Sequence, residues 1–226
     1  MLRPCAIGCT VVGLLVLSVS TALSADWPCW RGPNHDNTSE ESGWRIDWKA
    51  NPPKVLWQAA TGWRWGCPVV AGGRVFVHGD DYSGRSGTQI LHALDAETGK
   101  ELWRDESFVW GYNIQPLTYS PAVDGDHVYF YTASGVLKCL QADSGETVWT
   151  QDLSKTLRAR REVSYGYRCS PVVWKDRVMV TTRGGVPKDA PEQLGANLAA
   201  FDKVTGKLLW TNIQPSVNLK GRDPWG

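Results

Sequence analysis

The segment Ala93-Leu94-Asp95-Ala96-Glu97-Thr98-Gly99-Lys100-Glu101-Leu102-Trp103 returns twice further along the chain. The copies are Leu140-Gln141-Ala142-Asp143-Ser144-Gly145-Glu146-Thr147-Val148-Trp149 and Ala200-Phe201-Asp202-Lys203-Val204-Thr205-Gly206-Lys207-Leu208-Leu209-Trp210. In each copy an apolar run leads into a polar turn, and a tryptophan follows four residues after the glycine of that turn. An aspartate can accept N–H bonds within such a turn, and glycine tolerates a positive φ. The pattern therefore predicts a β-hairpin in every copy.

The spacing of the tryptophans shows the length of the repeat. Trp57, Trp103 and Trp149 follow one another at intervals of 46 residues, and the last interval, to Trp210, is 61. In each unit a proline also precedes a short apolar stretch, a turn and a longer apolar run; these stretches are Pro68-Val69-Val70, Pro121-Ala122-Val123 and Pro171-Val172-Val173. Each unit thus predicts four strands, of which the fourth ends at the tryptophan. Four strands in about 40–50 residues are typical of a β-propeller blade.

These repeats predict an all-β fold, a β-propeller built from four-stranded antiparallel blades. Three repeats are complete, and 54–57 is expected to be the outer strand of a fourth blade. A large flat side chain at one fixed place in each blade can fill the wedge between neighbouring blades. The residues assigned to this structural docking role are Trp57, Asp95, Thr98, Gly99, Trp103, Gly145, Trp149, Asp202, Thr205, Gly206 and Trp210.

Three to four blades are few for a closed ring, since propellers usually close with about 4–8 blades. We expect the chain to form part of a seven- or eight-bladed ring. The favoured explanation for the missing blades is a truncated record of a longer gene. The alternative is the assembly of several chains into one ring.

The first 25 residues have the features of an export signal. Arg3 gives a short basic start, 11–19 is almost wholly apolar, and small residues follow at 20–25. The alternative is an uncleaved membrane anchor, but Asp26 begins a segment rich in Trp and Pro rather than a basic cluster. The chain therefore divides into a signal peptide (1–25), a Trp- and Pro-rich segment (26–53) and a partial propeller (54–226). We expect the mature protein in the periplasm or outside the cell, without a transmembrane segment.

Charge and cysteine content limit the classes of partner. The chain has 24 basic and 23 acidic residues, and this balance argues against a nucleic-acid partner. Cys29, Cys67, Cys139 and Cys169 lack the close spacing of a metal site. Cys67 and Cys169 occupy similar places in non-adjacent repeats, which argues against a bond between them. We predict no disulfide framework and expect Cys139 to be a small buried hydrophobic residue.

The pattern Ala93-x-Asp95-x-x-Thr98-Gly99-Lys100-x-x-Trp103 resembles the tryptophan-docking motif of PQQ-dependent alcohol dehydrogenases and their PQQ-like relatives, which include BamB-type outer-membrane assembly factors. The opening Asp26-Trp27-Pro28-Cys29-Trp30-Arg31-Gly32-Pro33-Asn34 is similar to the start of secreted PQQ-like repeat proteins of planctomycete-type bacteria. The resemblance covers about residues 26–226 and implies the propeller fold. The second repeat departs from the motif at Gln141 and Glu146.

The resemblance also implies a chemistry. In the dehydrogenases of this superfamily, pyrroloquinoline quinone (PQQ) rests on Ca²⁺ beside a disulfide between adjacent cysteines. This chain contains no Cys-Cys pair, and we find no matching positions for the calcium ligands or the aspartate base of those enzymes. We therefore assign no catalytic or metal-binding residue and predict no cofactor, with PQQ and Ca²⁺ as the alternative.

The segments that link one blade to the next are expected to cross one face of the propeller toward its central channel. They are 58–66, 105–119 and 151–168, and they combine aromatic rings with arginine, a composition suited to anionic ligands or protein partners. In the favoured interpretation the rings pack under long loops while the arginines face water. The candidate binding residues are Trp63, Arg64, Trp65, Trp110, Tyr112, Asn113, Tyr165, Tyr167 and Arg168.

The remaining candidates are weaker. His78, Asp80 and Asp81 lie at the end of an expected strand, but the ligand spacing of a calcium-binding loop is absent, so we expect a solvated hairpin there. The favoured function is an exported PQQ-like propeller that acts as a binding or assembly scaffold for a protein or small-molecule ligand. The alternative is a PQQ- and Ca²⁺-dependent quinoprotein dehydrogenase, or a fragment of one.

Removal of the export signal is directly testable. Mass spectrometry of the protein from its native host is expected to give a mature N-terminus between Leu23 and Asp26, because the small residues there suit a signal peptidase. Membrane-bound protein that still begins at Met1 would contradict cleavage.

Overall fold

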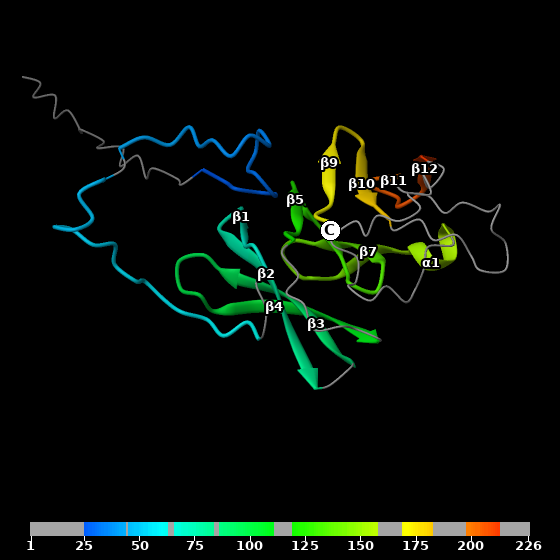
Figure 1. Ribbon diagram of the computed structural model, residues 1–226, viewed down its shortest axis with the longest axis horizontal. Helices are drawn as coiled ribbons and strands as arrows, with labels where there is room; N and C mark the ends of the chain where they lie inside the picture. The colour runs from blue at the N-terminus through cyan, green and yellow to red at the C-terminus, as the bar shows by residue number, and fades with distance from the viewer. Residues whose placement is uncertain are drawn as a thin grey trace, which may run out of the picture.

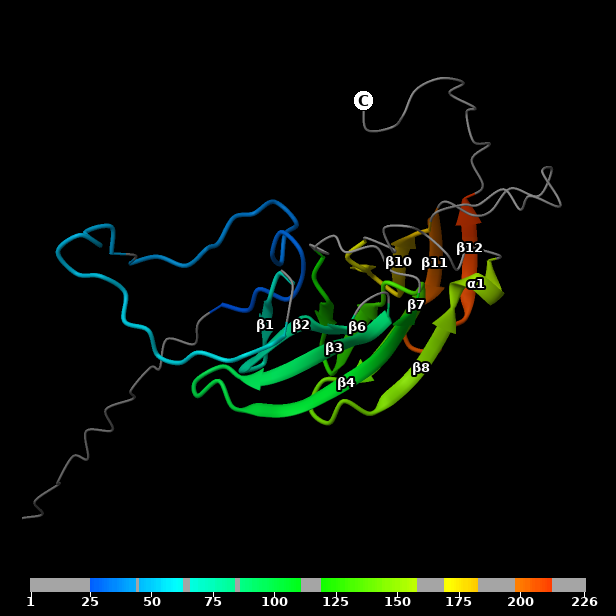
Figure 2. The ribbon, with the colours of Figure 1, turned by 60° about the horizontal axis from the view of Figure 1, so that its bottom comes forward.

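The computed structural model of the chain describes residues 25–43, 45–62, 66–83, 86–110, 119–157, 169–182 and 198–212. Its strands form three four-stranded antiparallel sheets, one for each repeat, and the strands of each sheet pair in chain order. In Figures 1 and 2 the three sheets lie side by side. This arrangement confirms an all-β, partial-propeller fold made of four-stranded antiparallel blades.

The strand boundaries follow the repeats. The first blade contains β1 (Val69–Ala71), β2 (Arg74–Ser83), β3 (Ser86–Asp95) and β4 (Glu101–Trp110); the second contains β5 (Ala122–Asp124), β6 (His127–Tyr131), β7 (Val136–Gln141) and β8 (Thr147–Asp152); the third contains β9 (Val172–Trp174), β10 (Arg177–Thr181), β11 (Leu198–Asp202) and β12 (Leu208–Asn212). The short strand β5 contacts both β1 and β9, and these three strands form the inner edge of the assembly.

The outer strands are longer than the sequence suggested. We expected each to end at its tryptophan, but β4 continues from Trp103 to Trp110, and β8 continues from Trp149 to Asp152. The extension follows from the hydrogen-bond ladder, because β3 begins early enough for Ser86 to pair with Trp110. The link to the second blade therefore starts after Trp110 rather than at Asp105.

A register shift precedes each docking turn and decides where the tryptophan points. Between β3 and β4 the pairing shifts after Ala93, so that Ala93 lies directly opposite Trp103. The same shift puts Cys139 opposite Trp149 and Ala200 opposite Trp210. A small side chain thus faces the indole in every blade, and the ring shares the face of the sheet that carries that small residue.

The turn between the third and fourth strands has nearly the same conformation in all three blades. In the first blade the Asp95 carboxylate accepts hydrogen bonds from the Thr98 backbone N–H at 2.8 Å and from the Thr98 hydroxyl at 2.6 Å. These bonds hold the pKa of Asp95 below its ordinary value. The glycine takes a positive φ of 70° at Gly99, 75° at Gly145 and 69° at Gly206. Any other residue there would be strained.

Trp103 and Trp149 each lie on the glycine turn of the next blade. The Trp103 Nε1–H donates to the Ala142 carbonyl at 3.0 Å, and the Trp103 ring covers Gly145 so closely that a Cβ on that glycine would lie 2.7 Å from it. Trp149 donates to the Lys203 carbonyl at 3.0 Å and covers Gly206 in the same way. These contacts connect the first blade to the second and the second to the third.

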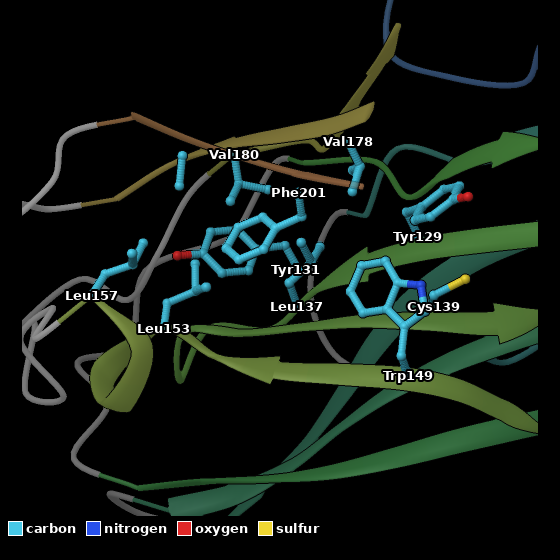
Figure 3. Packing of buried hydrophobic residues seen from close by; sticks show 11 residues of the cluster. Tyr129, Tyr131, Leu137, Cys139, Trp149, Leu153, Leu157, Val178, Val180 and Phe201 are labelled. Carbon is cyan, nitrogen blue, oxygen red and sulfur yellow. The ribbon is translucent and has the colours of Figure 1, made fainter. Parts of the chain in front are cut away.

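The apolar cores lie between the blades. Along β6, Val128 and Phe130 face the first blade, and Tyr129 and Tyr131 face the third. Both faces of the middle sheet are therefore buried, which explains why its apolar residues are consecutive. The cluster between the second and third blades is shown in Figure 3 and includes the fully buried Cys139, as predicted. Burial raises the pKa of the Cys139 thiol to about 12.

Two segments of the described chain differ from the sequence-based expectations. A one-turn helix, α1 (Leu153–Thr156), follows β8, where we had expected no helix; the Asp152 side chain caps it by accepting from the Ser154 N–H at 3.1 Å. The expected outer strand at 54–57 belongs to no sheet, because no described strand lies beside it to pair with.

The expectation of a solvated hairpin at His78, Asp80 and Asp81 is wrong for His78 and Asp80, whereas Asp81 is exposed. Strand β2 continues to Ser83, and both side chains are completely buried because they face the second blade. The His78 ring stacks on Tyr119, with 4.5 Å between the ring centroids and 15° between the planes. Neither ring nitrogen of His78 has a hydrogen-bond partner among the described residues.

Removal of the indole of Trp103 tests the contact between the blades. We expect Trp103→Ala to lower the free energy of unfolding by about 3 kcal/mol, the low end of the range for truncated buried aromatics, because Trp103 is only half-buried. Urea unfolding measures the change. Leu102→Ala is the matched control, since Leu102 is adjacent and exposed. Equal stability of the two variants would contradict a supporting role for Trp103.

Burial of His78 predicts a dependence of stability on pH. Desolvation, with a smaller effect from His92, lowers the pKa of His78 from 6.5 to about 4, so the unfolded chain binds a proton before the folded one does. His78 should therefore cost the folded state about 3 kcal/mol as the pH falls from about 6.5 to about 4. Urea titrations of His78→Phe should show a smaller loss over this range. His127→Asn, at a half-exposed site, serves as the control, and equal pH profiles for wild type and His78→Phe would refute the assignment.

Candidate functional site

The segment that follows the expected signal peptide lies along the inner edge of the blades. Trp27 pairs with Val70 of β1: its N–H donates to the Val70 carbonyl at 2.7 Å, and its own carbonyl accepts from the Val70 N–H at 3.0 Å. The next carbonyl, that of Pro28, accepts from the Val123 N–H of β5 at 2.8 Å. The segment therefore crosses from the first blade to the second (Figure 1) and satisfies backbone groups that the edge strands leave free.

A compact turn follows this crossing. The Cys29 thiol, only 8% exposed, donates to the Gly32 carbonyl at 3.1 Å and lies 3.7 Å from His35 Nδ1. Burial raises the pKa of this thiol. Gly32 has a φ of 78°, and a Cβ there would come within 2.8 Å of the Trp27 ring. The spacing of Trp27, Cys29 and Gly32 in the sequence thus follows from the packing of this turn.

Two residues of this turn hold a backbone conformation that is unfavourable for their type. Arg31 has a φ of 70° and His35 a φ of 56°, and the left-handed region costs a residue with a Cβ about 1–2 kcal/mol. Such conformations persist where the surrounding contacts hold them, and they cluster at binding and active sites. The backbone pairing of Trp27 and the hydrogen bond of Cys29 hold this turn in place. The side chains of Arg31 and His35 therefore start from fixed backbone positions.

A cavity of about 480 Å³ opens beside this turn, and we call it the inner-edge cavity. One wall comes from the turn, and the other comes from a residue just before β5 and from the residues that lead into β9. Its lining residues are Cys29, Trp30, Arg31, His35, Tyr119, Ser170, Pro171 and Val172. Trp30 is 50% exposed, and the side chains of Arg31 and His35 are also exposed. An indole, a guanidinium and an imidazole are therefore available to a ligand at one concave surface.

The far wall of the inner-edge cavity is fixed by buried polar contacts. Gln89 donates from Nε2 to the Tyr119 hydroxyl, and its Oε1 accepts from the Ala133 N–H at 2.9 Å. The Ser120 N–H donates to the Ser170 hydroxyl at 2.9 Å, which connects the second blade to the third. These bonds join three blades around Tyr119, so the wall does not depend on loop packing alone.

A second cavity, of about 740 Å³, lies at the hairpin end of the first two blades. Its lining includes several carboxylates, but two of them already form contacts that stabilise the fold. Asp26 accepts from the Gly72 N–H at 3.2 Å, and Asp124 forms an ion pair with Lys203. Asp26 thus connects the N-terminal segment to the first blade, and Asp124 connects the second blade to the third.

The candidate binding residues on the linking segments lie outside the described part of the chain. This holds for Trp63, Arg64, Trp65, Tyr112, Asn113, Tyr165, Tyr167 and Arg168, and for the side chain of Trp110. Sequence reasoning missed the inner-edge cavity, because Trp30, Arg31 and His35 belong to a segment that shows no repeat. The available signal was the density of Trp and Pro around Gly32.

The described residues also limit the other possible sites. Within them no three His, Cys, Asp or Glu side chains gather as metal ligands, and Cys29, Cys67, Cys139 and Cys169 are free thiols. No helix in the described ranges is long and apolar enough to cross a membrane.

Comparisons with known proteins show which family the chain resembles. The family model described as "Outer membrane protein assembly factor BamB" matches residues 34–113 and 87–223. The quinohemoprotein alcohol dehydrogenase ADH IIB of Pseudomonas putida is 29% identical over 141 residues, which are 60% of this chain and 19% of that protein. BamB of Yersinia pestis is 26% identical over 139 residues, or 58% of this chain and 30% of that protein.

The same fold occurs in a solved structure. The quinohemoprotein alcohol dehydrogenase of Comamonas testosteroni superimposes with a TM-score of 0.59 and 20% sequence identity over 83% of this chain and 27% of that chain. The chain thus spans less than a third of the length of these relatives. With three four-stranded blades and a family match over most of its length, the chain belongs to the BamB-type family of PQQ-like β-propeller repeat proteins.

Proposed function

We propose that this protein is an exported binding or assembly scaffold that recognises a protein or small-molecule ligand at the inner-edge cavity. The observation that carries the proposal is the pair Trp30 and Arg31, exposed beside a cavity on a turn whose backbone is held in place. Tryptophan and arginine supply much of the energy in protein interfaces, because both bring large contact area together with hydrogen-bonding groups.

The rigidity of the surroundings supports a binding role. The cavity walls belong to three blades that are joined by the Trp103 and Trp149 contacts and by the Gln89 bridge. A surface that is ordered before binding loses little conformational entropy when a ligand arrives. A ligand with an aromatic or apolar part and a negative charge would suit Trp30 and Arg31 together.

Export is the second part of the proposal. The apolar stretch 11–19, followed by small residues, is the feature that supports it. Free thiols at Cys29 and Cys139 are compatible with export, because both are buried and Cys139 has a raised pKa, which makes it a poor nucleophile.

The alternative function is that of a PQQ- and Ca²⁺-dependent dehydrogenase, and the similarity to quinohemoprotein alcohol dehydrogenases favours it. The residues of this chain do not fit a site for PQQ and Ca²⁺. The chain has no adjacent cysteines, and its described part brings no three carboxylate, imidazole or thiol groups together. We therefore rank this function second.

The binding proposal predicts that changes at the cavity reduce ligand capture. Trp30→Ala and Arg31→Asn should each lower the amount of specifically retained ligand about tenfold, the effect of losing one interface contact of about 1.4 kcal/mol. Asparagine is chosen because it tolerates the positive φ at Arg31. The measurement is a pull-down from native periplasmic extract, quantified by mass spectrometry.

Trp48→Ala is the matched control, since it removes an exposed indole from the same segment without touching the cavity. Equal capture by all three variants would show that the ligand binds elsewhere. Submicromolar binding of PQQ in Ca²⁺ buffer, together with dye-linked alcohol oxidation, would instead favour the dehydrogenase.

A further inference from the structure

The residues just after the expected cleavage region are all joined to distant parts of the chain. The Ala25 N–H donates to the Glu41 carboxylate, with 2.6 Å between the nitrogen and Oε1. The next three residues, 26–28, are hydrogen-bonded to the inner edge of the first and second blades. A cut that leaves Ala25 in place therefore preserves all of these contacts.

The bond between Ala25 and Glu41 closes a loop that contains the turn beside the inner-edge cavity. The loop 25–41 is drawn in blue in Figure 1, and the turn that carries Trp30 and Arg31 lies between its two ends. Joining the ends of a loop reduces the number of conformations open to the residues between them. The strength of the Ala25–Glu41 bond therefore bears on the order of this turn.

Signal-peptide removal can change the charge of one partner in this bond. In the unprocessed chain the Ala25 nitrogen is an amide, and only Glu41 carries a charge. Hydrolysis of the Ser24–Ala25 peptide bond by a signal peptidase consumes one water, leaves a carboxylate on Ser24 and turns the Ala25 nitrogen into an α-ammonium. Two opposite charges then face each other, so Coulomb attraction adds to the hydrogen bond.

The sequence permits a cut at this bond. A signal peptidase requires small residues at the first and third positions before the cut, and the cuts after Ala22 and after Ser24 meet this rule. A cut after Ala25 would place a leucine at the third position and would also remove the contact with Glu41. Of the two permitted cuts, the cut after Ser24 is the one that creates a charge on the nitrogen that Glu41 contacts.

We propose that the chain is processed between Ser24 and Ala25, and that Glu41 binds the new α-ammonium and so tightens the turn beside the inner-edge cavity. The inference rests on the proposed export of the protein, but not on the identity of the ligand in the cavity. Processing thus supplies a cationic group that the precursor lacks. The processed protein holds its N-terminal segment on the blades more firmly than the precursor does.

The position of the cut is tested by expressing the full-length chain in a host that exports it. Mass spectrometry of the processed protein should give Ala25 as the first residue. A processed chain that begins at Leu23 or Asp26 would overturn the inference while leaving export in place. An uncut chain that keeps Met1 would overturn the proposed export as well.

The role of the α-ammonium is tested by hydrogen exchange on the processed protein. Acetylation near neutral pH is selective for an α-amine, because its pKa of about 7.7–8.0 lies well below that of lysine, and it turns the ammonium back into an amide. Acetylation should raise the exchange rate of the Trp27 N–H, which donates to the Val70 carbonyl, about threefold, the effect of losing one solvent-accessible ion pair. The amides of β6 are the internal reference and should not change.

The role of Glu41 is tested by removing its charge. Glu41→Gln should raise the exchange rate of the Trp27 N–H to a similar extent, and acetylation of this variant should add little, because the ion pair is already lost. Glu40→Gln is the matched control, since Glu40 is adjacent and exposed and is not the carboxylate that Ala25 contacts. An exchange rate that acetylation leaves unchanged in the wild type, or an equal effect of acetylation in Glu41→Gln and wild type, would refute the binding of the α-ammonium by Glu41.

Discussion

The contact of an indole with a glycine turn on the next blade is the constraint on which the rest of this structure depends. It needs a glycine with positive φ and a carbonyl that accepts the indole N–H, and at Trp103 and Trp149 a small residue also lies opposite the tryptophan in its own sheet. The contact occurs at Trp57, Trp103 and Trp149 with hydrogen bonds of 2.9–3.0 Å. Because it fixes the distance between neighbouring blades, it also fixes which rows of apolar residues meet.

Sequence reasoning predicted this part of the fold because its signals are local and repeated. The positions of Gly99, Gly145 and Gly206 identify the turns, and consecutive apolar residues such as 128–131 identify sheets buried on both faces. The burial of His78 was missed, since it depends on how far the β2–β3 ladder extends and on a ring at Tyr119, which lies in another blade. The sequence around His78 carries no signal for the length of this ladder or for the contact with Tyr119.

The inner-edge cavity could not be predicted for a similar reason. Trp27 pairs with Val70 across more than forty residues of sequence, and no periodicity marks the partner. The opening motif was informative about family, yet its placement against β1 and β5 comes only from the backbone hydrogen bonds. The aromatic and arginine residues singled out on the linking segments lie outside the described residues, so their role remains a prediction.

The turn beside the inner-edge cavity combines exposed side chains with backbone strain. At the inner-edge cavity, Arg31 and His35 hold left-handed backbone conformations, and the surrounding hydrogen bonds must offset that cost in the free protein. At the first blade, the glycine turn at Gly99 is instead covered by Trp57. A ligand is therefore best sought where the chain maintains an open, strained turn beside a cavity.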